Sequence, residues 1–198
     1  MHRRSTRLLA ATIAALLLGT VAVGAASAHG RHHHHRHDLH RAAAATAKFH
    51  SLARASKAGY GPFPEGVPLH ECISNLSGPG AMGYHWLNPD LLTTELDPTR
   101  PQVLVYAPDR HGHLHLVALE FVVFKDAWDA EHPGRMPRLF GQEFMETPAP
   151  NRYEIPAFYA LHVWLFKYNP AGLFAPFNPR VSCNPGAPHA PAARLAPA

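Results

Sequence analysis

The sequence has few of the residues and motifs that identify a familiar enzyme or metal protein. It contains 2 cysteines in 198 residues, and they do not form the Cys-x-x-Cys spacing typical of zinc sites. The His-Glu-x-x-His helix of metalloproteases and the Gly-x-Ser-x-Gly turn of serine hydrolases are absent. The segment 78–83, GPGAMG, lacks the lysine and the strand-to-helix setting of a phosphate-binding loop. These absences exclude the usual motif-based assignments of activity.

Long apolar runs are also absent, except at the N-terminus. Residues 8–25 are apolar, follow three arginines within the first seven residues, and precede the small-residue segment Ala-Ser-Ala at 26–28. This order is typical of a secretory signal peptide. We therefore expect residues 1–28 to be removed, and the mature chain to begin at His29 without stable membrane insertion. The expected location is secreted, extracellular or in the cell envelope.

The chain has little excess charge once this leader is set aside. The formal net charge is +4, and loss of the three leader arginines lowers it to +1. Residues 59–198 contain thirteen acidic and nine basic side chains. Proteins that bind nucleic acid carry a basic surface for the phosphate backbone. We therefore expect no nucleic-acid partner.

Composition divides the mature chain into three parts. Residues 29–41, HGRHHHHRHDLHR, contain seven histidines and almost nothing to bury, and residues 185–198 are rich in proline and alanine. Both segments are predicted to be disordered. Flexible imidazoles of this kind collect Zn²⁺, Ni²⁺ or Cu²⁺ without a defined site. Residues 42–184 are predicted to form a single domain.

The two cysteines, Cys72 and Cys183, lie near the two ends of that domain. An isolated pair in an exported chain indicates a disulfide. Such a bridge would close a loop of about 110 residues and stabilise the domain by roughly 4 to 5 kcal/mol. Two free thiols, or a mixed cysteine and histidine metal site, are the alternatives.

The hydrophobic pattern predicts an α+β fold, with an N-terminal helix followed by a mostly antiparallel sheet. The central feature is a hairpin, because two β-rich runs flank the turn residues 108–112. In the second run, apolar residues occupy both odd and even positions. Both faces of this strand should therefore be covered, and it should be a central strand. The expected helices are 42–58, 89–94 and 125–132, and the expected strands are 81–87, 102–107, 113–124, a short one near 143–146, and 157–167.

Five segments together resemble a family of small, secreted, uncharacterised proteins of high-GC Gram-positive bacteria. This resemblance implies neither an activity nor a ligand. It implies that His85, Glu120, His162 and both cysteines lie in the family-like segments, whereas the histidines at 111, 113 and 115 fall where relatives vary. The segments are ATAKFHSLARASKAGY (45–60), GAMGYHWLNPDLL (80–92), PQVLVYAPDRHGHLHLVALEFVV (101–123), LFGQEF (139–144) and LHVWLFKYNPAGLFAPFNPRVSC (161–183).

Three ionisable residues interrupt apolar strands: His85, Glu120 and His162. A buried carboxylate without a partner is so unfavourable that it takes up a proton, pairs with a cation or binds a metal. Two imidazole nitrogens and a carboxylate oxygen form a ligand set for a divalent transition metal such as Zn²⁺, Fe²⁺ or Mn²⁺. The alternative is a structural ion pair of Glu120 with His162, Arg152 or Lys167.

These residues lead to one main functional hypothesis and two rivals. The main hypothesis is a secreted protein that binds a small ligand or a metal in a pocket lined by His85, Glu120 and His162. The first rival is a metal-dependent extracellular enzyme that uses the same residues, with Glu120 as ligand or base. The second is a structural cell-envelope protein without a small-molecule site. The sequence does not decide whether the protein is an enzyme, nor its oligomeric state.

Two weaker metal sites are also conceivable from the sequence. His111, His113 and His115 alternate along one strand, so their rings would project from one face and could bind Cu²⁺ or Zn²⁺ weakly. The new terminus, His29, could chelate copper through its amine and ring. Solvent exposure is the more usual state of such a histidine ladder.

Overall fold

The computed structural model describes residues 23–184, with side chains from residue 34 onward. The predicted signal peptide, 1–28, lies mostly outside the described residues, and the predicted tail, 185–198, lies wholly outside them. Both remain predictions. Within the described part, no helix is both long and apolar enough to cross a membrane.

The N-terminal helical region is longer than predicted, and it is broken. Helix α1 (Val23–Thr46) leads into a 3₁₀ turn, η1 (Ala47–His50), and then into α2 (Leu52–Lys57). The break occurs at Ser51, whose backbone is extended and whose hydroxyl accepts a hydrogen bond from the Arg54 amide. The turn buries the Phe49 side chain, and the Phe49 carbonyl accepts a hydrogen bond from the Tyr106 hydroxyl at 2.7 Å. The single helix predicted for 42–58 is therefore wrong in its middle.

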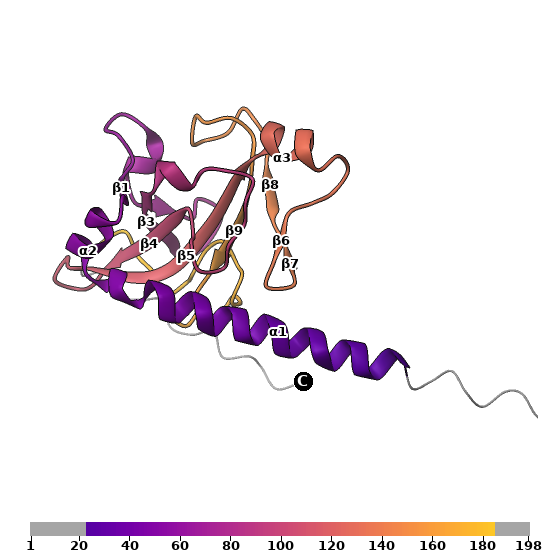
Figure 1. The fold of residues 1–198 in the computed structure, drawn as a ribbon. Coiled ribbons are helices and arrows are strands. Elements are labelled where there is room, and N and C mark those ends of the chain that lie inside the picture. The colour runs from indigo at the N-terminus through magenta and orange to yellow at the C-terminus, as the bar shows by residue number, and fades with distance from the viewer. Residues whose placement is uncertain (1–22, 185–198) are drawn as a thin grey trace, which may run out of the picture.

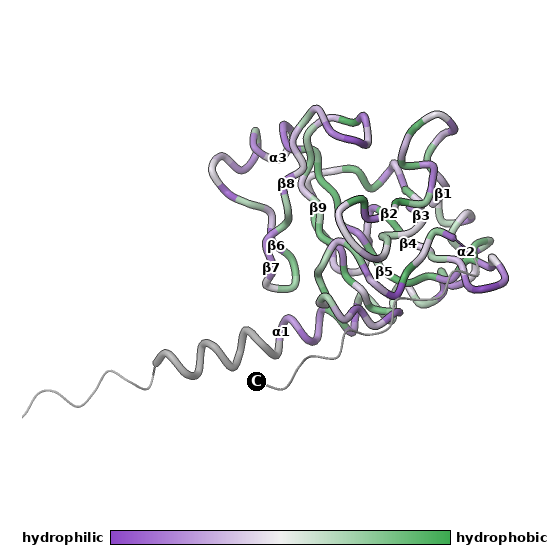
Figure 2. The backbone as a smooth tube through the Cα atoms, turned by 180° about the vertical axis from the view of Figure 1, so that it is seen from behind, coloured by the Kyte–Doolittle hydropathy of each residue, from purple (hydrophilic) through white to green (hydrophobic). Residues whose placement is uncertain are grey.

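The histidine-rich segment 29–41 is part of α1, which disagrees with the prediction that it is disordered. Residues 31–46 contain neither glycine nor proline, so nothing in this stretch interrupts a helix that the alanines at 42–45 favour. The C-terminal end of α1 packs through Leu39 and Ala42 on the core, while the rest of the helix extends beyond the sheet (Figure 1). In Figure 2, the coloured part of α1, next to the label, is mostly purple, which marks hydrophilic residues.

A seven-stranded antiparallel sheet forms the body of the protein, so the predicted α+β class is confirmed. The strand order is β1-β3-β4-β5-β9-β8, and β2 also pairs with β3. The predicted hairpin is β4 and β5, and it occupies the centre of the sheet. The strands are β1 (Gly61–Pro62), β2 (Ile73–Ser74), β3 (Ala81–Leu87), β4 (Val103–Pro108), β5 (Leu114–Phe124), β8 (Met145–Thr147) and β9 (Phe158–Val163).

The smaller elements follow the predictions less closely. Helix α3 (Lys125–Glu131) is confirmed, whereas the helix expected at 89–94 is only the 3₁₀ turn η3 (Pro89–Leu91). Strand β9 ends at Val163, earlier than expected, because the Trp164 amide and indole donate to carbonyls of residues 173 and 175. The remaining elements are η2 (Pro68–His70) and a two-stranded ribbon of β6 (Arg138–Leu139) and β7 (Gln142–Glu143).

The sheet buries both of its faces, as the continuous apolar run in β5 predicts. One face packs against the N-terminal helical region through side chains that include Tyr106, Phe121 and Leu161. The other face carries Val103, Val122 and further small side chains and is covered by irregular chain. Successive residues of a strand point to opposite faces, so this second face also receives the side chains considered below.

The cover of the second face is fixed by the disulfide between Cys72 and Cys183, which confirms the predicted bridge. Cys72 directly precedes β2, and Cys183 follows Val181, which is buried in the cluster on this face. Asn178 adds a backbone bridge to Ala81 at the start of β3. The C-terminal chain is thereby held over the sheet.

A first prediction concerns Gly83, which allows β3 to approach β4. Its φ is +119°, and a Cβ there would lie 2.3 Å from the Tyr106 carbonyl oxygen. Gly83→Ala is therefore expected to lower the free energy of unfolding by about 2 to 3 kcal/mol in urea denaturation. Gly61→Ala, in β1, is the control, because no atom lies within 4 Å of its added Cβ. Equal stability of the two variants would contradict this account.

Candidate metal centre

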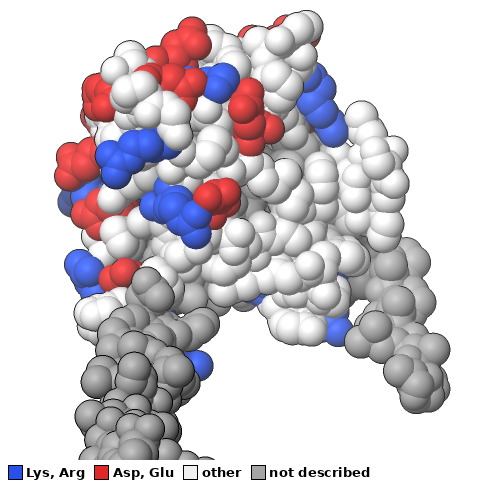
Figure 3. All heavy atoms as spheres, turned by 90° about the vertical axis from the view of Figure 1, so that its right-hand side faces the viewer, with Lys and Arg blue, Asp and Glu red and all other residues white. Residues whose placement is uncertain are grey.

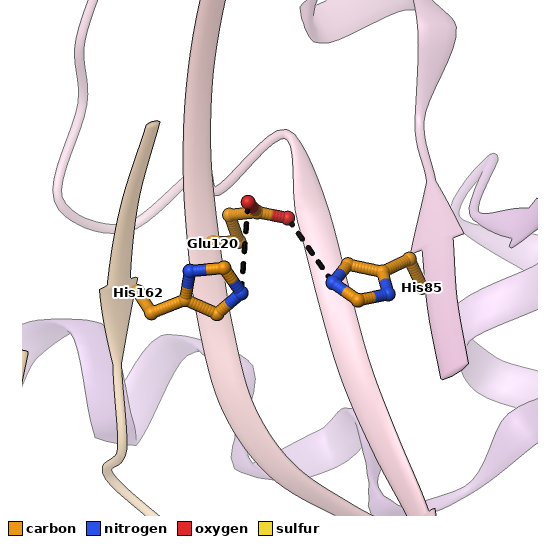
Figure 4. A group of neighbouring side chains, drawn as sticks. All are labelled: His85, Glu120 and His162. Carbon is orange, nitrogen blue, oxygen red and sulfur yellow. Dashed lines mark ion pairs between the residues drawn. The ribbon is translucent and has the colours of Figure 1, made fainter. Parts of the chain in front are cut away.

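The three ionisable residues predicted to form a site come from three strands and meet on one face of the sheet. Glu120 in β5 lies directly opposite His162 in β9. On its other side Glu120 pairs with Val103 in β4, and His85 in β3 pairs with Val105, two residues along the same strand. The small valine side chains of β4 leave room for the ring of His85 to reach over that strand. Figure 4 shows both imidazoles pointing at the Glu120 carboxylate.

The nitrogen and oxygen atoms of the site are close but do not form ordinary hydrogen bonds. His85 Nε2 lies 3.5 Å from Glu120 Oε2, and His162 Nε2 lies 3.6 Å from Glu120 Oε1. The ring planes of the two histidines are nearly perpendicular, at 87°. His162 Nε2 and His85 Nδ1 are buried without any hydrogen-bond partner. Unpartnered buried polar atoms are rare and costly, so the group lacks something that would satisfy it.

Burial sets the protonation state of this group. The three residues are 3%, 7% and 5% exposed. Burial raises the pKa of Glu120 to about 8. It lowers the pKa of His85 to about 4 and that of His162 to about 3, to which the neighbouring His85 also contributes. At neutral pH the metal-free group therefore consists of a protonated carboxyl and two neutral imidazoles. Neutral imidazole is the form of histidine that binds metals.

The spacing of these atoms fits a small divalent ion. One ligand atom from each residue can be chosen so that all three lie within 4.8 Å of one another. Ligand atoms placed about 2.1 Å from a tetrahedral ion lie about 3.4 Å apart, which is within this 4.8 Å bound. Elsewhere in residues 34–184, no other group of three such side chains is this compact. Two nitrogens and one carboxylate leave at least one coordination position for water or a ligand.

The site forms part of the wall of a cavity of about 380 Å³ between the sheet and its cover. The remainder of the wall is mostly apolar, with Val103, Val122 and Ala160 from the sheet and Phe177 from the C-terminal chain, and Arg152 also lines it. The cavity is partly open to the surface, so a bound molecule can enter and fill it.

The cationic partners considered for Glu120 in the sequence lie elsewhere. The Arg152 guanidinium donates to the Ser74 carbonyl at 3.2 Å and lies over the Tyr153 ring. In the described part of the chain, the carboxyl of Glu120 lies within 4 Å of both histidine rings and forms no ion pair with Arg152 or Lys167. Of the three partners considered, only His162 therefore lies beside the buried carboxyl.

The histidine ladder is exposed and has a local partner. His115 Nε2 and His113 Nδ1 lie 3.1 and 3.4 Å from the Asp109 carboxylate in the β4–β5 turn. The hydrogen bond from His115 is the main reason that the pKa of Asp109 lies well below its usual range. Asp109 also accepts bonds from two backbone amides, so its contacts with the ladder order the turn.

No family model, curated protein or solved structure matches this chain. The resemblance to secreted proteins of high-GC Gram-positive bacteria therefore remains a prediction.

The absence of a nucleic-acid partner is also still a prediction. The face shown in Figure 3 has acidic and basic side chains interspersed, without a continuous basic surface.

Proposed function

We propose that the protein binds a divalent transition metal, with Zn²⁺ or Fe²⁺ as the leading candidates, through His85, Glu120 and His162. The observation that carries this proposal is a buried carboxyl held between two imidazoles, with the His162 Nε2 atom unpartnered and no lysine or arginine of the described residues paired with the carboxyl. A metal would replace the proton of Glu120 and satisfy the His162 Nε2 atom. The disulfide suits an oxidising compartment, so the proposed setting of this metal site is extracellular.

The cavity also bears on the rival hypotheses. A purely structural envelope protein predicts exposed or hydrogen-bonded side chains at these positions and no cavity beside them. The unpartnered His162 Nε2 atom and the cavity of about 380 Å³ count against that rival. A metal-dependent enzyme would use the same residues, and the open coordination position on the cavity is what such an enzyme needs. Metal binding is common to the main hypothesis and to this rival.

The proposal is tested by titrating metal-stripped protein with Co²⁺, whose visible absorption reports its coordination. The native chain is expected to bind one Co²⁺ ion tightly. The His162→Ala variant is expected to bind that ion more weakly. The affinity should fall at least about a hundredfold, because loss of an outer-shell partner alone costs about 10- to 100-fold. Both chains keep the histidine-rich segment 29–41, so its loose binding cancels in the comparison.

His115→Ala is the matched control, because it removes an exposed histidine from the ladder and leaves the buried group intact. It should bind Co²⁺ as the native chain does. Competition with Zn²⁺ and Fe²⁺ then ranks the metals. Identical titration curves for the native chain and His162→Ala would refute metal binding at this site.

A further inference from the structure

The cavity beside the metal centre has two chemically different parts. Its polar part is the group His85, Glu120 and His162, and its apolar part is formed by side chains such as Val122, Ala160 and Phe177. The open end is bordered by Met145 on the edge strand β8, whose side chain is 54% exposed. A molecule that fits both parts has one polar end and an otherwise apolar body.

The size of the cavity limits the length of that body. Its volume of about 380 Å³ lies near the lower end of the range for small-molecule pockets, which is about 300 to 1,000 Å³. A ligand of about ten to thirteen non-hydrogen atoms fits this space. A long-chain lipid is too large to be enclosed, and a very small molecule such as acetate would leave the apolar walls uncovered.

Charge balance selects the polar end, on the premise of the metal proposed above. A divalent ion with one ionised carboxylate and two neutral imidazoles carries a net charge of +1 in a nearly apolar enclosure. An uncompensated buried charge is unfavourable. Arg152, which also lines the cavity, adds a further positive charge to its surroundings. A ligand with a single negative charge therefore complements the site better than a neutral or cationic one.

We infer that the cavity binds a monocarboxylic acid whose apolar body has about seven to ten carbon atoms. Its carboxylate would bind the metal held by His85, Glu120 and His162, and its body would lie along Val122 and Ala160 toward Met145. This inference rests on the proposed metal site, and it names the class of molecule that the site takes.

The test is a titration of Co²⁺-loaded and Zn²⁺-loaded full-length protein with decanoate, 1-decanol and acetate. Decanoate is expected to change the visible spectrum of the Co²⁺ protein and to bind at least about tenfold tighter than either of the others. It should bind the metal-stripped protein at least about tenfold more weakly than the Zn²⁺-loaded protein. Ala160→Phe, which fills the cavity, should weaken decanoate binding at least about tenfold and still take up Co²⁺.

Two further variants keep the test decisive if Ala160→Phe does not fold. Met145→Trp narrows the open end from a half-exposed position and should also weaken decanoate binding. Leu76→Trp, at a position 77% exposed and away from the cavity, should leave it unchanged. If Co²⁺ binds but decanoate does not alter its spectrum, or if 1-decanol binds as tightly as decanoate, this inference is wrong while the metal site stands. If Co²⁺ does not bind the buried group, the proposed function fails first.

Discussion

Replacing both cysteines with serine is expected to lower the free energy of unfolding by about 4 to 5 kcal/mol. Cys72 and Cys183 are separated by 111 residues, and the loss of loop-closure entropy from the unfolded chain grows with the length of the closed loop. The serine side chains are close in size to the cysteines they replace, so the folded packing should change little. A loss of this size is a large part of the stability of an ordinary domain.

Urea denaturation of the native chain and of the double variant measures this effect. Addition of a reductant is the internal control, because it should destabilise the native chain to the level of the variant and leave the variant unaffected. The cavity cover should loosen at the same time, since Cys183 anchors the C-terminal chain that contributes Phe177 to the cavity wall. A difference below about 1 kcal/mol would show that the bridge contributes little to folding.

The second large effect is a pH dependence that arises from Glu120 in the metal-free protein. The ordinary pKa of this carboxyl is 4.5, and burial raises it to about 8 in the folded state. Between these values the folded chain holds a proton that the unfolded chain has lost, so stability falls as the pH rises. Each pH unit costs about 1.4 kcal/mol, which amounts to about 5 kcal/mol over the whole interval.

The two histidines act in the opposite direction at lower pH. Their ordinary pKa is 6.5, and burial keeps His85 neutral to about pH 4 and His162 neutral to about pH 3. Their contribution to stability is thus complete above pH 6.5 and is lost as the pH falls. The summed contribution of the three residues should therefore peak near pH 6.5 in the absence of metal.

The test is urea denaturation of the metal-stripped native chain and of the metal-stripped Glu120→Gln variant, from about pH 4.5 to 8.5. The two chains share every other titratable group, so the difference between their stabilities reports the contribution of the Glu120 carboxyl. The native chain should lose about 5 kcal/mol relative to the variant across this range. Saturating Zn²⁺ should reverse the sign, since the metal binds the ionised carboxylate and its affinity rises with pH. Parallel stability curves for the two metal-free chains would contradict the account.

The composition of the candidate site was predictable from the sequence, but its geometry was not. His85, Glu120 and His162 were recognisable because each is an ionisable residue within an otherwise apolar run. Their meeting depends on the pairing of β5 with β9, in which Phe124 lies opposite Phe158 and Glu120 therefore lies opposite His162. The chain between these strands is about thirty residues long and includes α3 and three short strands, so local periodicity does not determine this register.

The helical region shows a similar limit. The spacing of Phe49 and Leu52 favours a continuous helix, but burial of Phe49 and the bond from Tyr106 to its carbonyl favour a turn. These are contacts with β4, more than fifty residues away, and tertiary contacts of this kind override local helix propensity. The strands β3, β4 and β5 were predicted more accurately, because β-branched and aromatic residues with clear turn signals specify them locally.

The position of β9 in the chain has a consequence for the order of events during biosynthesis. His162 and Cys183 both belong to the last part of the domain, so neither the metal site nor the disulfide can form until almost the whole chain is available. If the predicted leader directs export of the chain in an unfolded state, translocation is nearly complete before the ligands assemble. The metal would then be acquired from the surroundings of the cell and not from its cytoplasm.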